Sequence, residues 1–473
     1  MFLSLRAARK SAFIIVRIEI FMPVVIVFNI IQVYINCKCG KHARNRKNAK
    51  TAGGMVDFSS ASPAGGAMET EMIAASYSTD EKDAAQYVLP PLLPGKCPTA
   101  AQWEASRRAE VLALLREESY GASLPRPERM EVRTLSVRPD ALGGLAVRRE
   151  LEVTLSRSDG RSHRFVMLVY LPKHVSGPVP AFLGLNFKGN HHTTDETDVR
   201  PTGGEYVEGG SGLQSYRWCF SEVVRRGYAT ATLCYHDIHP DRKDGTAQSV
   251  FALFFSPEEY GKIGETHSII GAWAWGLSRA REALETLPEI APDKIIVHGL
   301  SRLGKTSLWA GATDENFAMV IANESGCGGA ALHKRKFGEN LSQHFTAHLD
   351  RGVPVWFVSK LGRYIYREEE LPFDSHMLLA LTAPRPLCVG TAAEDLDADP
   401  KGEFLACRAA APLWELYGFP PFAGETMIAP GETIPGIVNY HIRPGGHDQT
   451  PEDWAVYLDA ADAYFFPDRR TQP

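Results

Sequence analysis

The stretch that most constrains this chain is residues 295–305, IIVHGLSRLGK, in which an apolar run stops at Gly299 and leads directly into Ser301. This pattern is typical of a β-strand that turns sharply into a helix and presents a nucleophile at the turn. Residues 306–312, TSLWAGA, are compatible with that helix, whose first turn would bring backbone N–H groups near the serine. The sequence therefore predicts that Ser301 is a nucleophile served by a histidine and a carboxylate from later in the chain.

Strand and helix signals alternate on both sides of this turn. The expected strands include 151–155, 165–171, 179–186, 228–235, 294–298, 318–323, 387–391 and 438–442, and the expected helices include 103–118, 271–287 and 303–312. Such alternation predicts βαβ units and a mostly parallel sheet. With His447 in the late motif RPGGHD (443–448), the chain order serine, acid, histidine fits a three-layer α/β-hydrolase fold.

Bulk composition excludes several classes of protein. The 473 residues are 44% hydrophobic, which suits a globular enzyme, and 51 basic against 56 acidic residues give no excess of positive charge for nucleic acid. Eight cysteines are scattered, and only Cys37 and Cys39 lie close together. We therefore expect no zinc site, and we interpret cysteines in apolar segments, such as Cys234 and Cys388, as buried free thiols.

The N-terminal 50 residues form a hydrophobic and basic segment. Residues 20–36 are strongly apolar and follow four basic residues, which is typical of a signal peptide or a single anchor helix, so a membrane association through 20–36 is one interpretation. Residues 38–50 are basic, and positive charge on this side of the apolar segment opposes export of the chain that follows it. An alternative is a true start at Met55, Met68 or Met72. The expected location is secreted or cell envelope, or cytoplasmic if the chain starts at Met55 or later.

Three segments follow from this organisation. Residues 1–50 are the signal, the anchor or a mis-assigned start, 51–84 are rich in Ala, Gly, Ser and Thr as a flexible linker would be, and 85–473 form the catalytic domain.

The segment 299–305, GLSRLGK, departs from the usual Gly-x-Ser-x-Gly pattern, because Leu303 stands where the second glycine is expected. Together with NESGCGGAAL (323–332), it resembles the glucuronoyl esterases, carbohydrate esterase family 15. Further matching motifs are FLGLNFKGN (182–190), LPFDSHMLLALTAPRP (371–386), ADPKGEF (398–404) and GGHD (445–448). The cysteines paired in fungal members are replaced by Leu300 and Asp448, so the bacterial branch is the better match.

The resemblance implies roles for particular residues. Ser301 would be the nucleophile, His447 the general base, and Arg302 a donor that stabilises the oxyanion. Family members place the acid at one of two positions, which correspond here to Glu324 and Asp395. Both are present and the choice stays open, with Glu394 a weaker third candidate.

The same resemblance implies that Lys305 and Glu339 bind the uronic acid ring. A tryptophan that commonly follows the acid is replaced by Asp397, which puts affinity for the usual ring in doubt.

The function expected from this resemblance is hydrolysis of the 4-O-methyl-glucuronoyl ester between glucuronoxylan and lignin alcohols, through an acyl-enzyme on Ser301. The alternatives are an acetyl or feruloyl xylan esterase, or an inactive carbohydrate-binding relative. We expect no cofactor, no metal, no nucleic acid partner, and a monomer.

Overall fold

The computed structural model describes residues 77–95, 98–207, 209–242, 244–346 and 356–468, all of which fall within the compact unit 61–473. The predictions for residues 1–50 and for most of the linker lie outside these ranges. Among the described residues no helix is long and apolar enough to cross a membrane.

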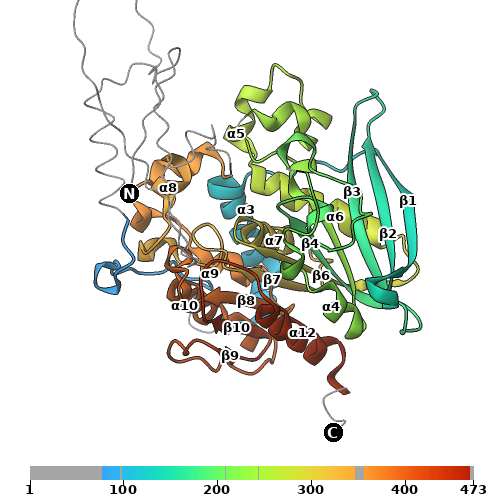
Figure 1. Cartoon of the computed structure of the whole chain (residues 1–473). Coiled ribbons are helices and arrows are strands. Elements are labelled where there is room, and N and C mark those ends of the chain that lie inside the picture. The colour runs from blue at the N-terminus through green and yellow to red at the C-terminus, as the bar shows by residue number, and fades with distance from the viewer. Residues whose placement is uncertain (1–76, 96–97, 208, 243, 347–355, 469–473) are drawn as a thin grey trace, which may run out of the picture. The chain divides into compact units, whose positions relative to one another are not determined.

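One mixed sheet organises the described chain (Figure 1). Its strands are β1 (Arg129–Ala141), β2 (Ala146–Ser156), β3 (Ser162–Pro172), β4 (Val179–Asn186), β5 (Ala229–Cys234), β6 (Ile290–Leu300), β7 (Met319–Asn323), β8 (Leu387–Ala392), β9 (Glu432–Ile434) and β10 (Val438–Arg443). They lie in the order β1-β2-β3-β5-β4-β6-β7-β8-β10-β9. The run from β5 through β10 pairs in parallel, whereas β1–β3 and β9 add antiparallel edges. The predicted mostly parallel sheet is confirmed.

Helices fill the connections between the strands. They are α2 (Ala100–Gln102), α3 (Arg108–Leu115), α4 (Phe220–Arg225), α5 (Ile263–Thr266), α6 (Ile269–Leu284), α7 (Arg302–Thr313), α8 (Leu341–Thr346), α9 (Ser375–Ala380), α10 (Pro400–Ala410), α11 (Pro412–Glu415) and α12 (Pro451–Phe465). The predicted helix 103–118 is part of a continuous helical stretch through Tyr120 that contains two π-helical turns.

The helices cover both faces of the sheet because side chains alternate along each strand. Ile296 and Ile321 pack with Trp454 of α12 in one cluster, while Val297 and Val320 join the core on the α6 and α7 side. In Figure 1, α4 and α12 lie in front of the sheet and α6 lies behind it. The result is the predicted three-layer arrangement, in which the carboxyl ends of the parallel strands lie at one common edge of the sheet.

Residues 77–85 pack on the domain. The Ser78 carbonyl accepts a hydrogen bond from the Gly338 N–H at 2.8 Å, and the Ala85 N–H donates to the Arg335 carbonyl at 2.9 Å. Glu81, in the short helix η1 (Glu81–Asp83), pairs with the guanidinium of Arg335. The composition assigns residues up to 84 to a linker, whereas the structure holds the last eight of them against the domain.

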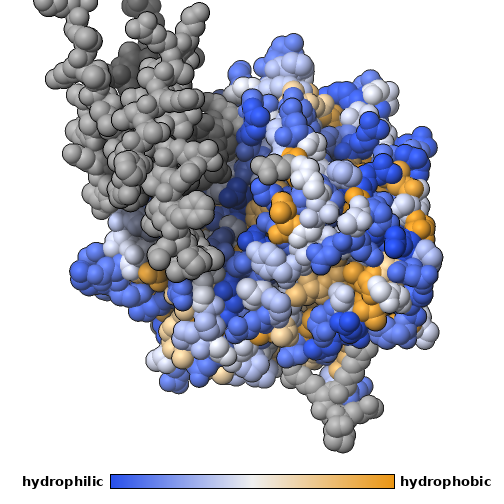
Figure 2. All heavy atoms as spheres, in the orientation of Figure 1, coloured by the Kyte–Doolittle hydropathy of each residue, from blue (hydrophilic) through white to orange (hydrophobic). Residues whose placement is uncertain are grey.

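The face drawn in Figure 2 is mostly hydrophilic, and hydrophobic residues on it form separate patches. Large exposed hydrophobic side chains in the described chain include Val88, Val137, Leu213 and Leu396. Single exposed hydrophobic residues of this kind are normal on the surface of a folded domain.

Candidate active site

Ser301 lies at the sharp turn between β6 and α7. Its φ of 60° is in the left-handed region, which is costly for a residue with a side chain and is typical of a nucleophile elbow. Glycine is required at position 299, because a Cβ there would lie 2.1 Å from the Leu303 carbonyl oxygen. Leu303, at the off-pattern position, is buried in the core beneath the turn. The predicted strand, serine and helix are therefore all present.

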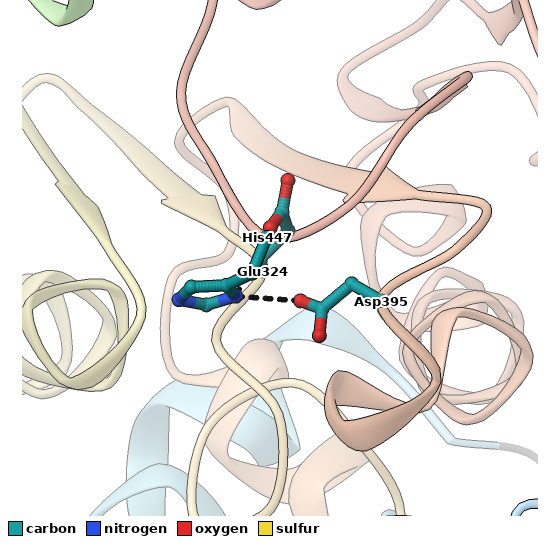
Figure 3. Close-up of side chains that lie close together, drawn as sticks. All are labelled: Glu324, Asp395 and His447. Carbon is teal, nitrogen blue, oxygen red and sulfur yellow. Dashed lines mark hydrogen bonds and ion pairs between the residues drawn. The ribbon is translucent and has the colours of Figure 1, made fainter. Parts of the chain in front are cut away.

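His447 lies in the loop after β10, with both candidate acids beside its ring. Its Nδ1 is 2.6 Å from Asp395 Oδ2, within good hydrogen-bonding geometry, and 3.1 Å from Glu324 Oε2 (Figure 3). Asp395 follows β8 and Glu324 follows β7, so neighbouring parallel strands deliver the two carboxylates to one edge of the sheet. Since Nδ1 faces the acids, Nε2 is the ring nitrogen left to exchange a proton with a nucleophile.

Arg443 binds both Glu324 and the loop that carries His447. Its guanidinium is 2.6 Å from Glu324 Oε1 and 2.9 Å from Asp453 Oδ2, and all three side chains are buried. Arg443 also donates to the carbonyls of Gly446 and Asp448, the residues on either side of His447. One guanidinium thus fixes both the Glu324 carboxylate and the loop that carries the histidine.

The cluster changes the acidity of its members. Burial lowers the pKa of His447, but the hydrogen bond to Asp395 and the contact with Glu324 outweigh it and raise the pKa to about 9. Burial raises the pKa of Glu324 to about 7, against the opposing effects of His447 and Arg443. At a pH between these two values, the imidazole is a cation beside the ionised Glu324 carboxylate, which is the state that a general base reaches after taking a proton.

Arg302, the first residue of α7, is held by two neighbours. Its Nη1 is 2.5 Å from Asp241 Oδ2, and its guanidinium lies 4.7 Å from the centre of the Trp356 ring. Trp356 Nε1 in turn donates to Asp241 Oδ1 at 2.7 Å. The Nε of Arg302 is buried and has no hydrogen-bond partner among the described residues. Asp241 and Trp356 therefore orient the guanidinium, and its Nε–H is a donor for which the described residues provide no acceptor.

Lys305, buried one helical turn beyond the elbow, forms an ion pair with Glu339, whose side chain is partly exposed. Lys305 Nζ is 3.0 Å from Glu339 Oε2, and His344 Nδ1 is 3.6 Å from the other carboxylate oxygen. Burial raises the pKa of Glu339, but His344 and Lys305 outweigh it and lower the pKa to about 2. A Cβ at Gly326, which has a φ of 58°, would lie 3.2 Å from Glu339 Oε2, so the glycine keeps space beside the pair.

Asp397 occupies the short helix η15 (Leu396–Ala398), directly after Asp395. Its side chain is exposed and accepts a hydrogen bond from the Tyr77 hydroxyl at 2.5 Å, and its carbonyl accepts one from the Glu339 N–H at 2.9 Å. η15 therefore connects the histidine's acid to the Lys305–Glu339 pair. Glu394 is also exposed, and its N–H donates to the Gly445 carbonyl, so its contribution to this loop is through the backbone.

The ligand atoms of Glu324, Asp395 and His447 lie within 4.8 Å of one another, a spacing that could hold a metal ion. Two features of the described atoms favour proton sharing instead. The 2.6 Å contact between His447 and Asp395 is a hydrogen-bond distance, and the Arg443 cation already neutralises Glu324. The absence of a functional metal stays a prediction.

Some buried titratable side chains of the described chain pack in the core rather than in the site. His298 is buried between Trp218, Trp454 and Phe182, and burial lowers its pKa to about 3, as expected for a histidine in the core. Cys234 and Cys388 are buried free thiols, as predicted.

Sequence reasoning missed Asp241 and Arg443 as parts of the site, and it predicted Trp356 only as a core or cleft wall, without its contact to Arg302. Arg443 stands inside the RPGGHD motif, four residues before His447, so its position was a usable signal. Asp241 and Trp356 approach Arg302 from distant loops, and no local pattern marks them.

Comparison with known proteins adds independent evidence. A family model described as "Glucuronyl esterase, fungi" matches residues 219–418. The chain is 36% identical over 403 residues to carbohydrate esterase MZ0003 of an unknown prokaryotic organism, covering 82% of this chain and 91% of that protein. It is 28% identical over 334 residues to a 4-O-methyl-glucuronoyl methylesterase of Schizophyllum commune, covering 70% and 72% respectively.

Solved structures agree. A glucuronoyl esterase from Solibacter usitatus is 37% identical, with a TM-score of 0.74, over 82% of this chain and all of that one. A promiscuous CE15 esterase from a marine bacterial metagenome is 35% identical, with a TM-score of 0.72, over the same shares. The predicted α/β-hydrolase fold and the predicted resemblance are confirmed.

Proposed function

Because the chain belongs to carbohydrate esterase family 15, the glucuronoyl esterases, we propose that Ser301 and His447 hydrolyse a glucuronoyl ester. The observation that carries this proposal is the His447 ring bound by two carboxylates at the sheet edge where the strained serine elbow also emerges. No metal or cofactor is required for this reaction.

In the acylation half, His447 Nε2 takes the proton from Ser301 Oγ as that oxygen attacks the ester carbonyl. Negative charge then develops on the former carbonyl oxygen. Arg302, oriented by Asp241, supplies a positive donor for that oxygen, an effect worth on the order of 10²–10³ in rate for one oxyanion donor. His447 next gives its proton to the departing alcohol, and the uronoyl group stays on Ser301.

In the deacylation half, His447 takes a proton from water, whose oxygen attacks the acyl carbonyl. The bond to Ser301 Oγ breaks, the serine recovers its proton from His447, and the free uronic acid leaves. The same histidine thus serves as base and acid in each half, and carboxylates beside Nδ1 stabilise its cationic form each time.

We assign the orienting role mainly to Asp395 and a supporting role to Glu324. Asp395 makes the shorter contact with Nδ1, 2.6 Å against 3.1 Å. Glu324 divides its oxygens among Arg443, the Asp448 N–H and His447. A carboxylate so fully engaged holds the loop as well as the ring.

Lys305 and Glu339 suit recognition of the uronic acid ring. The ammonium donates to sugar hydroxyls, the carboxylate accepts from them, and the ion pair fixes both before substrate arrives. This pair favours a uronate in the acyl half over the acetyl or feruloyl alternatives, in which the sugar is the alcohol. The substrate class proposed is the 4-O-methyl-glucuronoyl ester between glucuronoxylan and lignin alcohols.

Hydrolysis of benzyl glucuronate and of an acetylated xylo-oligosaccharide, side by side, tests this function. We expect turnover of the glucuronate ester, a loss of at least about 10³-fold in kcat for Ser301→Ala, and little deacetylation. Equal or faster deacetylation would favour the acetyl esterase alternative. Binding without any turnover that depends on Ser301 would favour the inactive relative.

An enzyme that acts on a plant cell-wall polymer has to meet it outside the producing cell, which supports the secreted or envelope location. Cell fractionation of the native host, with sequencing of the mature N-terminus, tests this. A product that starts at Met55 or later and stays in the cytoplasm would contradict it.

A further inference from the structure

A polar pocket of about 370 Å³ lies beside the loop that carries Glu339. Its lining includes Tyr77, Ser78, Asp83, Asn340, Tyr366 and Glu368. We propose that this pocket is a second subsite, which binds a neutral sugar unit of the glycan attached to the uronate. The proposal rests on the proposed function, and it assigns a binding role to residues before the predicted start of the catalytic domain.

The pocket shares a wall with the uronate site. Asn340 lines the pocket and directly follows Glu339, whose carboxylate faces Lys305. The Ser78 carbonyl binds the Gly338 N–H at 2.8 Å on the same loop. A glycan seated at the Lys305–Glu339 pair would therefore have its next unit within reach of this loop's outer side.

Tyr77 makes a second connection between the two sites. Its hydroxyl donates to Asp397 at 2.5 Å, and the Asp397 carbonyl accepts the Glu339 N–H. This hydrogen bond, with burial, raises the pKa of Tyr77 to about 12, so the hydroxyl keeps its proton and the bond across the physiological range. The segment before the domain thus supplies an aromatic ring beside the short helix η15 that carries Asp397.

The charge of the lining favours a neutral occupant. Lys336 is paired with Glu368 at 3.4 Å and also with Glu369, so this cation is already neutralised. The Asp83 carboxylate accepts from the Ser78 hydroxyl and adds further negative charge. Carboxylates accept hydrogen bonds from neutral sugar hydroxyls, whereas a second uronate would be repelled. The volume falls within the usual range for small-molecule sites, about 300–1,000 Å³.

The test compares kcat/KM on two benzyl esters, one of glucuronic acid alone and one of glucuronic acid linked to xylotriose. We expect the wild type to prefer the longer ester. Tyr77→Ala and Tyr366→Ala should each lower kcat/KM on the longer ester by about 10-fold, as expected for one or two lost contacts, and leave the short ester within about two-fold. Tyr464→Ala, which removes an exposed tyrosine ring from α12, is the matched control and should change neither.

The outcomes separate the two proposals. Equal wild-type rates on both esters, or variants that lower both rates equally, would overturn the subsite while leaving the esterase function standing. A wild type inactive on both esters would overturn the proposed function, and the subsite with it. A loss confined to the longer ester in both variants supports the subsite.

Discussion

At the scale of single residues, the site places two carboxylates on one imidazole nitrogen where one is enough to orient it. Asp395 contacts Nδ1 at 2.6 Å and is otherwise held through its backbone, while Glu324 is tied to Arg443 and to the histidine loop. The second carboxylate adds negative charge beside the ring and raises the pKa of His447 further. The pair therefore affects both how well the histidine is oriented and the pH at which it works.

We predict that Asp395→Asn lowers kcat more than Glu324→Gln does, on the order of 10²-fold against about 10-fold, because Glu324 remains as a weaker partner.

The dependence of kcat/KM on pH should change as well. The base must be neutral to accept a proton, so kcat/KM on a neutral ester should rise with pH until about 9 in the wild type. Removing either carboxylate lowers the pKa of His447, so the rise of kcat/KM with pH should occur at lower pH.

Stopped assays on benzyl glucuronate between about pH 5 and 10 measure both effects. Glu394→Gln, on the same loop but exposed, is the control and should leave the profile unchanged. If Glu324→Gln costs more than Asp395→Asn, the assignment of the main acid is reversed. If neither variant moves the profile, neither carboxylate controls the base.

Asp241 offers a second prediction at this scale. It binds Arg302 and Trp356 together, so Asp241→Asn should loosen the guanidinium and lower kcat by about 10- to 10²-fold with little change in KM, since the charge develops after substrate binds. The control is Asp244→Asn, which breaks an exposed pair with Arg242. A change in KM alone would assign Asp241 to substrate binding rather than to the oxyanion.

At the scale of elements, local patterns and long-range contacts differ in how well the sequence predicts them. β6, Ser301 and α7 follow from one short stretch, because a buried strand, a glycine and a helix start are local signals. β1 was not among the expected strands, since nearly all its residues are at least partly exposed and its apolar alternation shifts by one residue at the bulge between Thr134 and Ser136. The Asp241–Arg302 contact joins distant loops, and only the folded chain places those side chains together.

Arg443 links β10, the His447 loop and α12, and its replacement tests that link. Arg443→Met would leave Glu324 and Asp453 buried without their cation, which we expect to lower the free energy of unfolding by about 3–5 kcal/mol. Urea denaturation measures the change. Arg367→Met, which removes an exposed pair with Glu370, is the control and should cost less than about 1 kcal/mol. Equal effects of the two would mean that Arg443 does not hold these elements together.

At the scale of the whole molecule, the question is where the folded domain begins. Composition suggests residue 85, but residues 77–84 bind the loops that carry Glu339 and Arg335. A chain that starts at residue 77 should therefore match the full chain in stability and in hydrolysis of benzyl glucuronate. A chain that starts at residue 86 loses both Glu81 ion pairs, the hydrogen bond from Tyr77 to Asp397, and the Ser78 and Ala85 backbone hydrogen bonds.

We expect that second truncation to lower the free energy of unfolding by about 3 kcal/mol, on the basis of about 1 kcal/mol for each of the three lost hydrogen bonds. The loss stays moderate because Arg335 keeps Asp399 as a buried partner at 3.1 Å, and because Lys401, which also loses Glu81, is exposed to solvent. Urea unfolding of the two truncated chains, compared at one protein concentration, measures the difference. Equal stability would place the start of the domain at residue 86 or later, and an equal loss in both would place it before residue 77.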